Sequence, residues 1–151
     1  MLPARSKVEI RPAGARYYDF FINLIFMGRY PHFIKEVIEK MDIQEGQSIL
    51  DLGSGTGRNE CFMAEKVGHR GRVLGLDISR EMLNIARKRC QSYPWVQFNK
   101  KRIEALLSYR EEFDKVFISF TLHGFENDQK ITIIRNAYQA LKSGDPFTSW
   151  T

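Results

Sequence analysis

The sequence has few cysteines and no long apolar segment. Its 151 residues include only Cys61 and Cys90, which lie far apart and show no metal-type spacing. Such a pair predicts two thiols in or near the core rather than a disulfide framework, and it fits a reducing cytoplasm. The longest apolar stretch, residues 20–27, contains Asn23 and is far shorter than the roughly 20 residues that span a bilayer. We therefore expect neither a disulfide-stapled scaffold nor a membrane span.

The amino-terminal region also lacks the apolar core of a secretory signal peptide, since its first 16 residues carry five charged side chains. The length suits one domain, which we divide into a helical cap over 1–45 and a core over 46–151. The net charge is +5, and basic clusters at 87–89 and 100–102 could attract phosphate or an acidic substrate. Basic residues near a helix end are equally favourable for the helix itself, so nucleic acid is a less favoured partner.

Helix-like and strand-like segments alternate along the chain, which predicts an α/β fold with a mostly parallel sheet flanked by helices. The expected strands cover 47–52, 72–77, 96–98 and 115–120. The expected helices cover 17–27, a segment opened by Pro31, 57–67, 80–91 and 128–142, with a helical turn within 103–110. Apolar spacing places Phe33, Ile34, Val37, Ile38 and Met41 on one inward face, and Ile131, Ile134, Tyr138 and Leu141 on another. Ser79 is the expected cap of the helix that follows it, and Asp128 that of the last helix.

The most informative stretch is a buried strand that turns through three glycines into a helix. Ile49, Leu50 and Leu52 form the apolar strand, and Gly53, Gly55 and Gly57 follow. Glycines let a ligand lie against the backbone, and the free N–H groups of the next helix point at that ligand. The turn therefore predicts a site for a nucleotide-type cofactor.

The spacing of the glycines narrows the choice of cofactor. A dinucleotide fingerprint, G-x-G-x-x-G, would have its third glycine at position 58, which is Arg58. Asp77 ends the next strand, 20 residues past Gly57, where a carboxylate can accept hydrogen bonds from both hydroxyls of a ribose. Asp77 fits both nicotinamide and S-adenosylmethionine (SAM) sites, while Arg58 disfavours a nicotinamide-dependent oxidoreductase.

With Asp51 two residues before its first glycine, this G-x-G-x-G turn resembles motif I of the class I SAM-dependent methyltransferases. Other stretches resemble the small-molecule branch that includes the ubiquinone/menaquinone biosynthesis C-methyltransferases. They are Ala15-Arg16-Tyr17-Tyr18-Asp19, the segment 78–87 that contains Met82-Leu83, the strand 113–123 that ends in Leu122-His123, and Ala140-Leu141-Lys142-Ser143-Gly144. The resemblance implies a Rossmann-like methyltransferase fold, SAM as cofactor, S-adenosylhomocysteine as product and a small-molecule acceptor.

The resemblance also implies roles for individual residues. Gly53, Ser54, Gly55 and Gly57 would lie against the methionine part of SAM, Asp51 would organise the turn, and Asp77 would hold the ribose. Ile78 and Met82 would flank the adenine, and Ile103 would offer its backbone to the adenine edge. Ser119 and Phe120 would line the pocket near the sulfonium, and Tyr18 would close over the cofactor. Helical spacing alone would place Ile78 and Met82 in the core, and Tyr18 could simply pack its own helix down.

The sequence departs from the family at three places. Arg102 stands where an acidic residue usually binds the adenine amino group, so either Glu104 substitutes or backbone and packing hold the base. The turn before the fifth strand reads Ser143-Gly144-Asp145-Pro146. The chain ends at Thr151, so we expect the sheet to lack the final strands of the fold and to expose an edge through which a homo-oligomer could form.

The expected reaction is displacement at the sulfonium methyl, for which the protein mainly aligns donor and acceptor. An oxygen or phenol-type carbon acceptor needs a base, and His123 is the best-placed candidate, ahead of Glu126 and Asp128. A structural role for His123 remains the alternative. The sequence also leaves open a non-catalytic SAM- or nucleotide-binding domain or an inactive fragment of a methyltransferase, and it indicates no metal site.

Overall fold

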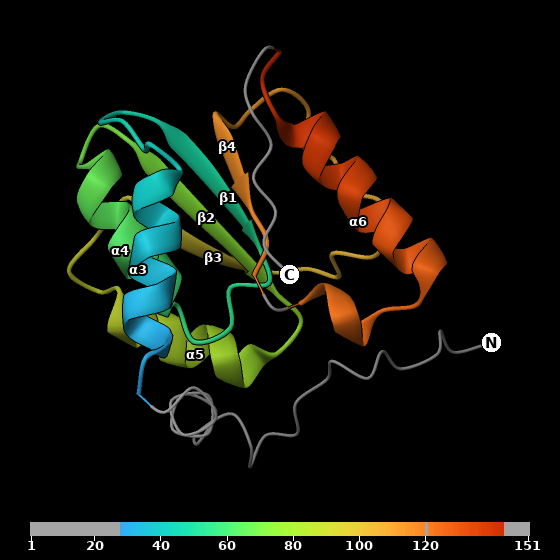
Figure 1. Ribbon diagram of the computed structural model, residues 1–151, viewed down its shortest axis with the longest axis horizontal. Coiled ribbons are helices and arrows are strands. Elements are labelled where there is room, and N and C mark those ends of the chain that lie inside the picture. Colours follow the sequence, from blue (N-terminus) through green and yellow to red (C-terminus); the bar gives the residue numbers. More distant parts are fainter. Residues whose placement is uncertain (1–27, 120, 144–151) are drawn as a thin grey trace.

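The computed structural model describes residues 28–119 and 121–143 (Figure 1). Tyr18, Phe120, the expected helix 17–27 and the turn from position 144 onward lie outside the described residues.

A four-stranded parallel sheet forms the centre of the fold. Its strands are β1 (Ser48–Leu52), β2 (Arg72–Asp77), β3 (Val96–Lys100) and β4 (Lys115–Phe117), in the order β3-β2-β1-β4. The predicted strands and the parallel sheet are confirmed, although regular β4 is shorter than expected. Because β2 and β4 flank β1 on opposite sides, the strand order reverses beside β1, and ligands of open α/β sheets bind at the carboxyl ends of the strands at such a point.

Helices cover both faces of the sheet (Figure 1). On one face lie α3 (Tyr30–Lys40), α4 (Arg58–Val67) and α5 (Arg80–Arg89), and on the other lies α6 (Asn127–Ala140). Local sequence explains several ends: Pro31 stands in the first turn of α3, Gly68 ends α4 at a φ of 65°, and the Ser79 hydroxyl accepts the Met82 N–H at 3.2 Å. The predicted cap at Ser79 is thus confirmed.

The core has a layer on each face of the sheet. On the α6 face, Leu50 and Leu52 of β1 pack with β2, β4 and the inward side of α6. On the opposite face, Ile49 and Phe117 pack with α3 and α4, where Ile34, Val37, Ile38 and Met41 are buried as predicted. Phe33, expected in that row, is 43% exposed instead, because it lies at the edge of the face that contacts α4.

The predicted inward face of α6 is wrong for three of its four residues, and only Leu141, directly after the helix, is buried. Ile131, Ile134 and Tyr138 are exposed, and the helix instead buries Ile133, Asn136, Ala137 and Ala140. Only one of these four buried residues is large and apolar, so ranking positions by hydrophobicity selects the wrong face of the helix. The cap is wrong as well: Glu126, not Asp128, precedes α6, and its N–H donates to the Gln129 side chain at 3.0 Å.

Residues 103–110 contain a single hydrogen-bonded turn, from the Ala105 N–H to the Arg102 carbonyl at 3.3 Å, and no helix. Asn136 explains how this segment can stay irregular. Its Nδ2 donates to the carbonyl oxygens of Ile103 at 2.8 Å and Ala105 at 2.7 Å, and its Oδ1 accepts the Leu107 N–H at 3.1 Å. These bonds satisfy the backbone of an irregular segment from outside, so the segment needs no helix of its own.

The two cysteines contradict the expectation of free thiols. Cys61 of α4 and Cys90, the residue after α5, form a disulfide with their Cα atoms 5.7 Å apart. They are 29 residues apart in sequence, and they meet because α4 and α5 contact each other on the same face of the sheet. Sequence spacing carries no information about that contact.

We predict that reducing this disulfide lowers the free energy of unfolding by about 3–4 kcal/mol, since it releases a loop of roughly 30 residues in the unfolded chain. Urea unfolding with and without dithiothreitol measures the change. The double variant Cys61→Ala/Cys90→Ala is the matched control, because its stability should not respond to the reductant. Two thiols titrating in the native, unreduced protein would contradict the prediction.

Candidate cofactor-binding site

The turn between β1 and α4 has the backbone that the glycines predict. Gly53, Gly55 and Gly57 all have positive φ angles, of 117°, 54° and 80°. A Cβ at Gly53 would meet Thr121, and one at Gly57 would meet Ala86 at 2.7 Å. At Gly55 a Cβ would meet no atom within 4 Å. Gly53 and Gly57 are therefore required by packing, whereas Gly55 presents bare backbone to open space.

Asp77 joins the end of β2 to this turn. Its Oδ2 accepts the Gly55 N–H at 2.9 Å, and its Oδ1 accepts the Ser79 N–H at 2.8 Å. Burial raises the pKa of Asp77, although these backbone donors act in the opposite direction. A carboxylate offers about four acceptor positions, so each oxygen retains capacity for a further donor.

Beneath the turn lies a pair of buried acids, Asp51 and Glu60. Both are fully buried, and Asp51 stands opposite Gly75 of β2 in the sheet. A Cβ at Gly75 would lie 2.9 Å from Glu60 Oε1, so the missing side chain of Gly75 makes room for the Glu60 carboxyl. Burial, and next their mutual interaction, raise the pKa of Glu60; burial also raises the pKa of Asp51. Two interacting carboxyls in a buried site titrate as a pair.

The opposite side of the turn is formed by the residues that follow β4. Asn59 Nδ2 donates to Ser119 Oγ at 3.3 Å, and Thr121 Oγ1 donates to the Ser119 carbonyl at 2.8 Å. The 3₁₀ turn Leu122–Gly124 follows and carries His123, which is exposed. Since Thr121 lies against Gly53, His123 comes two residues after a direct contact with the glycine turn.

The expected adenine side is more enclosed than the resemblance implies. Met82 and Ile103 are buried, Ile78 is half-buried, and the Ile103 carbonyl already accepts from Asn136. Arg102 Nε donates to Glu104 Oε1 at 2.8 Å. Glu104, the possible substitute for the usual adenine-binding acid, is thus paired with Arg102, which stands at the position of that acid.

Sequence reasoning missed Glu60, Asn136 and Arg89. Arg89 fixes the far end of the turn by donating to the Thr56 carbonyl at 3.0 Å and to its hydroxyl at 2.7 Å. A usable signal existed for Glu60, because it is in helical phase with the buried Met63, Ala64 and Val67. No such signal marks Asn136 or Arg89, whose partners are distant in sequence.

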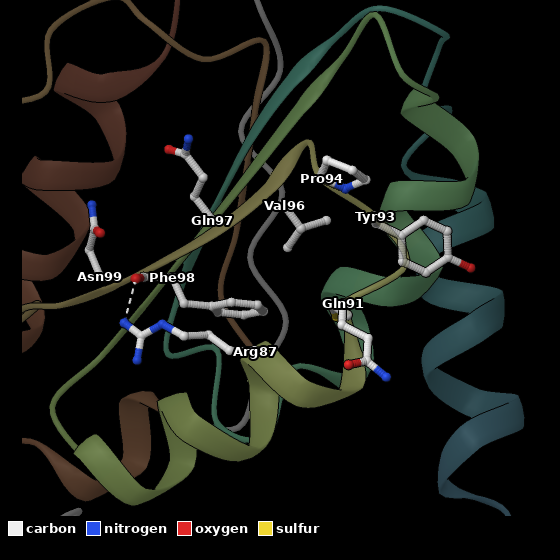
Figure 2. Close-up of a pocket in the computed structure, with 9 residues that line it drawn as sticks. Arg87, Gln91, Tyr93, Pro94, Val96, Gln97, Phe98 and Asn99 are labelled. Carbon is white, nitrogen blue, oxygen red and sulfur yellow. Dashed lines mark hydrogen bonds between the residues drawn. The ribbon is translucent and has the colours of Figure 1, made fainter.

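A pocket of about 380 Å³ lies elsewhere, between the end of α5 and the edge strand β3 (Figure 2). Arg87 borders it and donates to the Phe98 carbonyl of β3 at 2.9 Å. None of the predicted site residues lines this pocket. The candidate site is the crevice expected at the switch point of the sheet, bordered by the glycine turn, Asp77 and the segment after β4.

A glycine turn after β1, with a carboxylate after β2 bonded to it, defines a nucleotide-cofactor domain of the α/β class. Residues 49–144 match the family model described as a methyltransferase domain, and the chain belongs to this family of SAM-dependent enzymes.

Curated relatives agree with this family. The chain is 33% identical over 129 residues to demethylmenaquinone methyltransferase of Oceanobacillus iheyensis, covering 84% of this chain and 53% of the relative. It is 31% identical over 142 residues to the ubiquinone/menaquinone biosynthesis C-methyltransferase UbiE of Xanthomonas oryzae, covering 90% and 54%. The chain thus spans about half the length of the curated relatives it matches.

Solved structures share the fold. A SAM-dependent methyltransferase from Aquifex aeolicus matches with a TM-score of 0.76 at 19% identity, over 93% of this chain and 72% of that one. Phosphoethanolamine N-methyltransferase 1 of Haemonchus contortus, in complex with phosphoethanolamine and S-adenosylhomocysteine, matches with a TM-score of 0.69 at 17% identity, over 77% and 24%. The predicted Rossmann-like fold is confirmed.

The residues of the crevice fit SAM. Gly55 leaves space where a Cβ would otherwise stand, and the buried Ser54 hydroxyl has no hydrogen-bond partner among the described residues. Asp77 is the acceptor that a ribose requires. Bare backbone, a ribose acceptor and unpaired polar atoms at one strand end are the features that an adenosyl amino acid uses.

We predict that Gly57→Ala destabilises the protein more than Gly46→Ala. The two glycines have nearly equal φ angles, 80° and 84°, but only at Gly57 would the new Cβ strike another residue. The shared backbone cost is about 1–2 kcal/mol, and the clash with Ala86 adds roughly 1–3 kcal/mol. Urea unfolding of both variants measures the difference, and equal losses would contradict the packing role of Gly57.

Proposed function

We propose that this chain binds SAM in the crevice and transfers its methyl group to a small-molecule acceptor. The hydrogen bond between Gly55 and Asp77 is the observation that carries the proposal, because it joins the turn that would contact the amino-acid part of SAM to the residue that would hold the ribose. SAM supplies a methyl group already activated by a positive sulfur. The protein's tasks are then to align donor and acceptor and to exclude water.

The residue roles proposed from the sequence are compatible with the geometry. The backbone of Gly53, Ser54 and Gly55 would contact the methionine part, and the free acceptor positions of Asp77 would take the ribose hydroxyls. Ile78 and Met82 would bound the adenine, with Ile103 contributing through packing because its carbonyl is engaged. Ser119 would lie near the sulfonium, since it contacts both Asn59 and Thr121 beside Gly53.

For the acceptor, we propose an aromatic carbon of a quinol-type small molecule, on the strength of the names of the two curated relatives. His123 is the proposed base that removes a proton as the methyl is transferred. Its position just after Thr121 supports this role, because Thr121 contacts the glycine turn.

Partners and location are proposals as well. Arg87 and Arg89, two members of one basic cluster, donate to backbone carbonyls, which leaves them less suited to nucleic acid. No helix within the described ranges is long and apolar enough to cross a bilayer. We propose a cytoplasmic location and self-association through a sheet edge.

We predict that Asp77→Asn weakens binding of S-adenosylhomocysteine roughly tenfold to a hundredfold, because a charged acceptor for hydroxyl groups is lost. Calorimetric titration measures the dissociation constant, and Glu39→Gln, an exposed carboxylate on α3, is the matched control. A folded wild-type chain that binds neither SAM nor S-adenosylhomocysteine would overturn the proposed function, and tight binding of NAD would favour an oxidoreductase.

For catalysis, we predict that His123→Gln lowers methyl transfer to a quinol acceptor by roughly 10²–10⁴-fold while the affinity for S-adenosylhomocysteine stays unchanged. Transfer of a labelled methyl group from SAM gives the rate. Unchanged transfer by the variant would assign His123 a structural role. Binding of SAM without any turnover by the wild type would indicate a binding domain rather than an enzyme.

A further inference from the structure

Glu60 has no part in the function proposed above, yet it is an acidic residue fully buried in the first turn of α4. An ionised carboxylate in such a place normally has a basic partner or several donors. Neither oxygen of Glu60 and neither oxygen of Asp51 has a donor among the described residues. The two carboxyls interact with each other, and this interaction raises the pKa of Glu60 beyond what burial does.

Residues of the neighbouring strands leave room for the side chains of this pair. Asp51 lies on the α4 side of β1, on the same face as Ile49, and its neighbour across the sheet is Gly75. A Cβ at Gly75 would come within 2.9 Å of Glu60 Oε1, 2.7 Å of Ser54 Cβ and 2.8 Å of Phe98 Cδ1. Any larger residue at position 75 would displace the Glu60 carboxyl, so the site of the second acid is shaped by three separate elements.

The pair lies directly under the turn that would receive the amino-acid end of SAM. Asp51 is two residues before Gly53, and Glu60 is three residues after Gly57. Both acids are thus at the strand end where a ligand's ammonium group would arrive. A cation in a site of low polarity interacts far more strongly with a carboxylate than it would in water.

We propose that Asp51 and Glu60 hold one proton between them in the free protein and lose it when a ligand bearing an α-ammonium group binds at the turn. This inference rests on the proposed SAM site. On binding, a carboxyl O–H bond breaks and its proton passes to the buffer, which leaves two carboxylates facing one ligand cation. Glu60 is a positioning residue in this scheme, since it acts on the ligand through Asp51.

Other charged groups surround the pair. Asp77 at the end of β2 adds repulsion that raises the pKa of both acids. Arg58 precedes Glu60 on α4, Arg89 of α5 donates to Thr56, and Lys115 begins β4 at the level of Ile49, toward the amino end of β1. Phe98 from β3 and Phe117 from β4 are the uncharged neighbours.

Binding should therefore depend on pH in a defined direction. The ordinary pKa values of the two acids are 3.8 and 4.5, and burial raises both in the free protein. Between roughly pH 5 and pH 7 binding would release a proton, and affinity for S-adenosylhomocysteine would rise up to about tenfold per pH unit. An α-ammonium group stays protonated in this range, because its usual pKa is about 7.7–8.0.

The test is calorimetric titration of the wild-type protein with S-adenosylhomocysteine at pH 6 in buffers of different ionisation enthalpy, which counts protons released per ligand. We expect about one proton at most, and clearly more than with 5′-methylthioadenosine, which keeps adenine, ribose and sulfur but lacks the amino acid. Glu60→Gln should bind S-adenosylhomocysteine without proton release, because its amide donates to an ionised Asp51.

A second measurement does not depend on any ligand. Because the native pair binds more protons than the unfolded chain, the free energy of unfolding should fall as the pH rises from about 5 to 7. Glu60→Gln should reduce this slope, and Glu39→Gln, exposed on α3, should not.

The outcomes separate the two proposals. S-adenosylhomocysteine binding with no proton release, or with the same release as 5′-methylthioadenosine, overturns the shared proton and leaves the SAM site standing. A slope unaltered by Glu60→Gln also overturns it. A folded protein that binds neither compound overturns the proposed function and this inference together.

Discussion

The hydrogen bond from the Gly55 N–H to Asp77 is the contact on which the carboxyl edge of the sheet depends. It joins the turn after β1 to the end of β2, while the N–H groups of Gly53 and Ser54 donate to the Leu76 carbonyl at 2.9 Å. The glycine turn is thereby held against the second strand at three backbone positions. A crevice whose two sides are fixed in this way requires little reorganisation when a ligand enters, which is the condition for efficient alignment of reacting groups.

The same edge concentrates negative charge. Asp51, Glu60 and Asp77 come from β1, α4 and β2, and burial raises the pKa of each. A sheet that places three acids together without a basic partner among the described residues loses stability by doing so, and proteins retain such clusters mainly where they serve binding or catalysis. The proposed binding of a cationic methyl donor would give that arrangement a purpose. Glycines also make space at this edge of the sheet: the missing side chain of Gly75 leaves room for the Glu60 carboxyl, and that of Gly55 leaves room for a ligand.

The sequence predicted what depends on local pattern. Four strands, the helix start at Ser79, the glycine turn and Asp77 all follow from periodicity and turn chemistry, and the structure confirms their placement. It did not predict what depends on contacts between distant segments. The inward face of α6 uses Ala137, Ala140 and Asn136, whose importance appears only once the 103–110 segment lies against them. The Cys61–Cys90 bond likewise requires knowing that α4 and α5 are neighbours.

The hydrogen bond from Arg87 to the Phe98 carbonyl also affects the exposed margin of the sheet (Figure 2). β3 forms one margin of the described sheet, and an unpaired margin offers its peptide groups to any extended chain nearby. A guanidinium on one of these carbonyls both removes an acceptor and places a charge where an incoming strand would have to lie. The hydrogen bond from Arg87 therefore protects one position of the β3 margin from pairing with another extended chain.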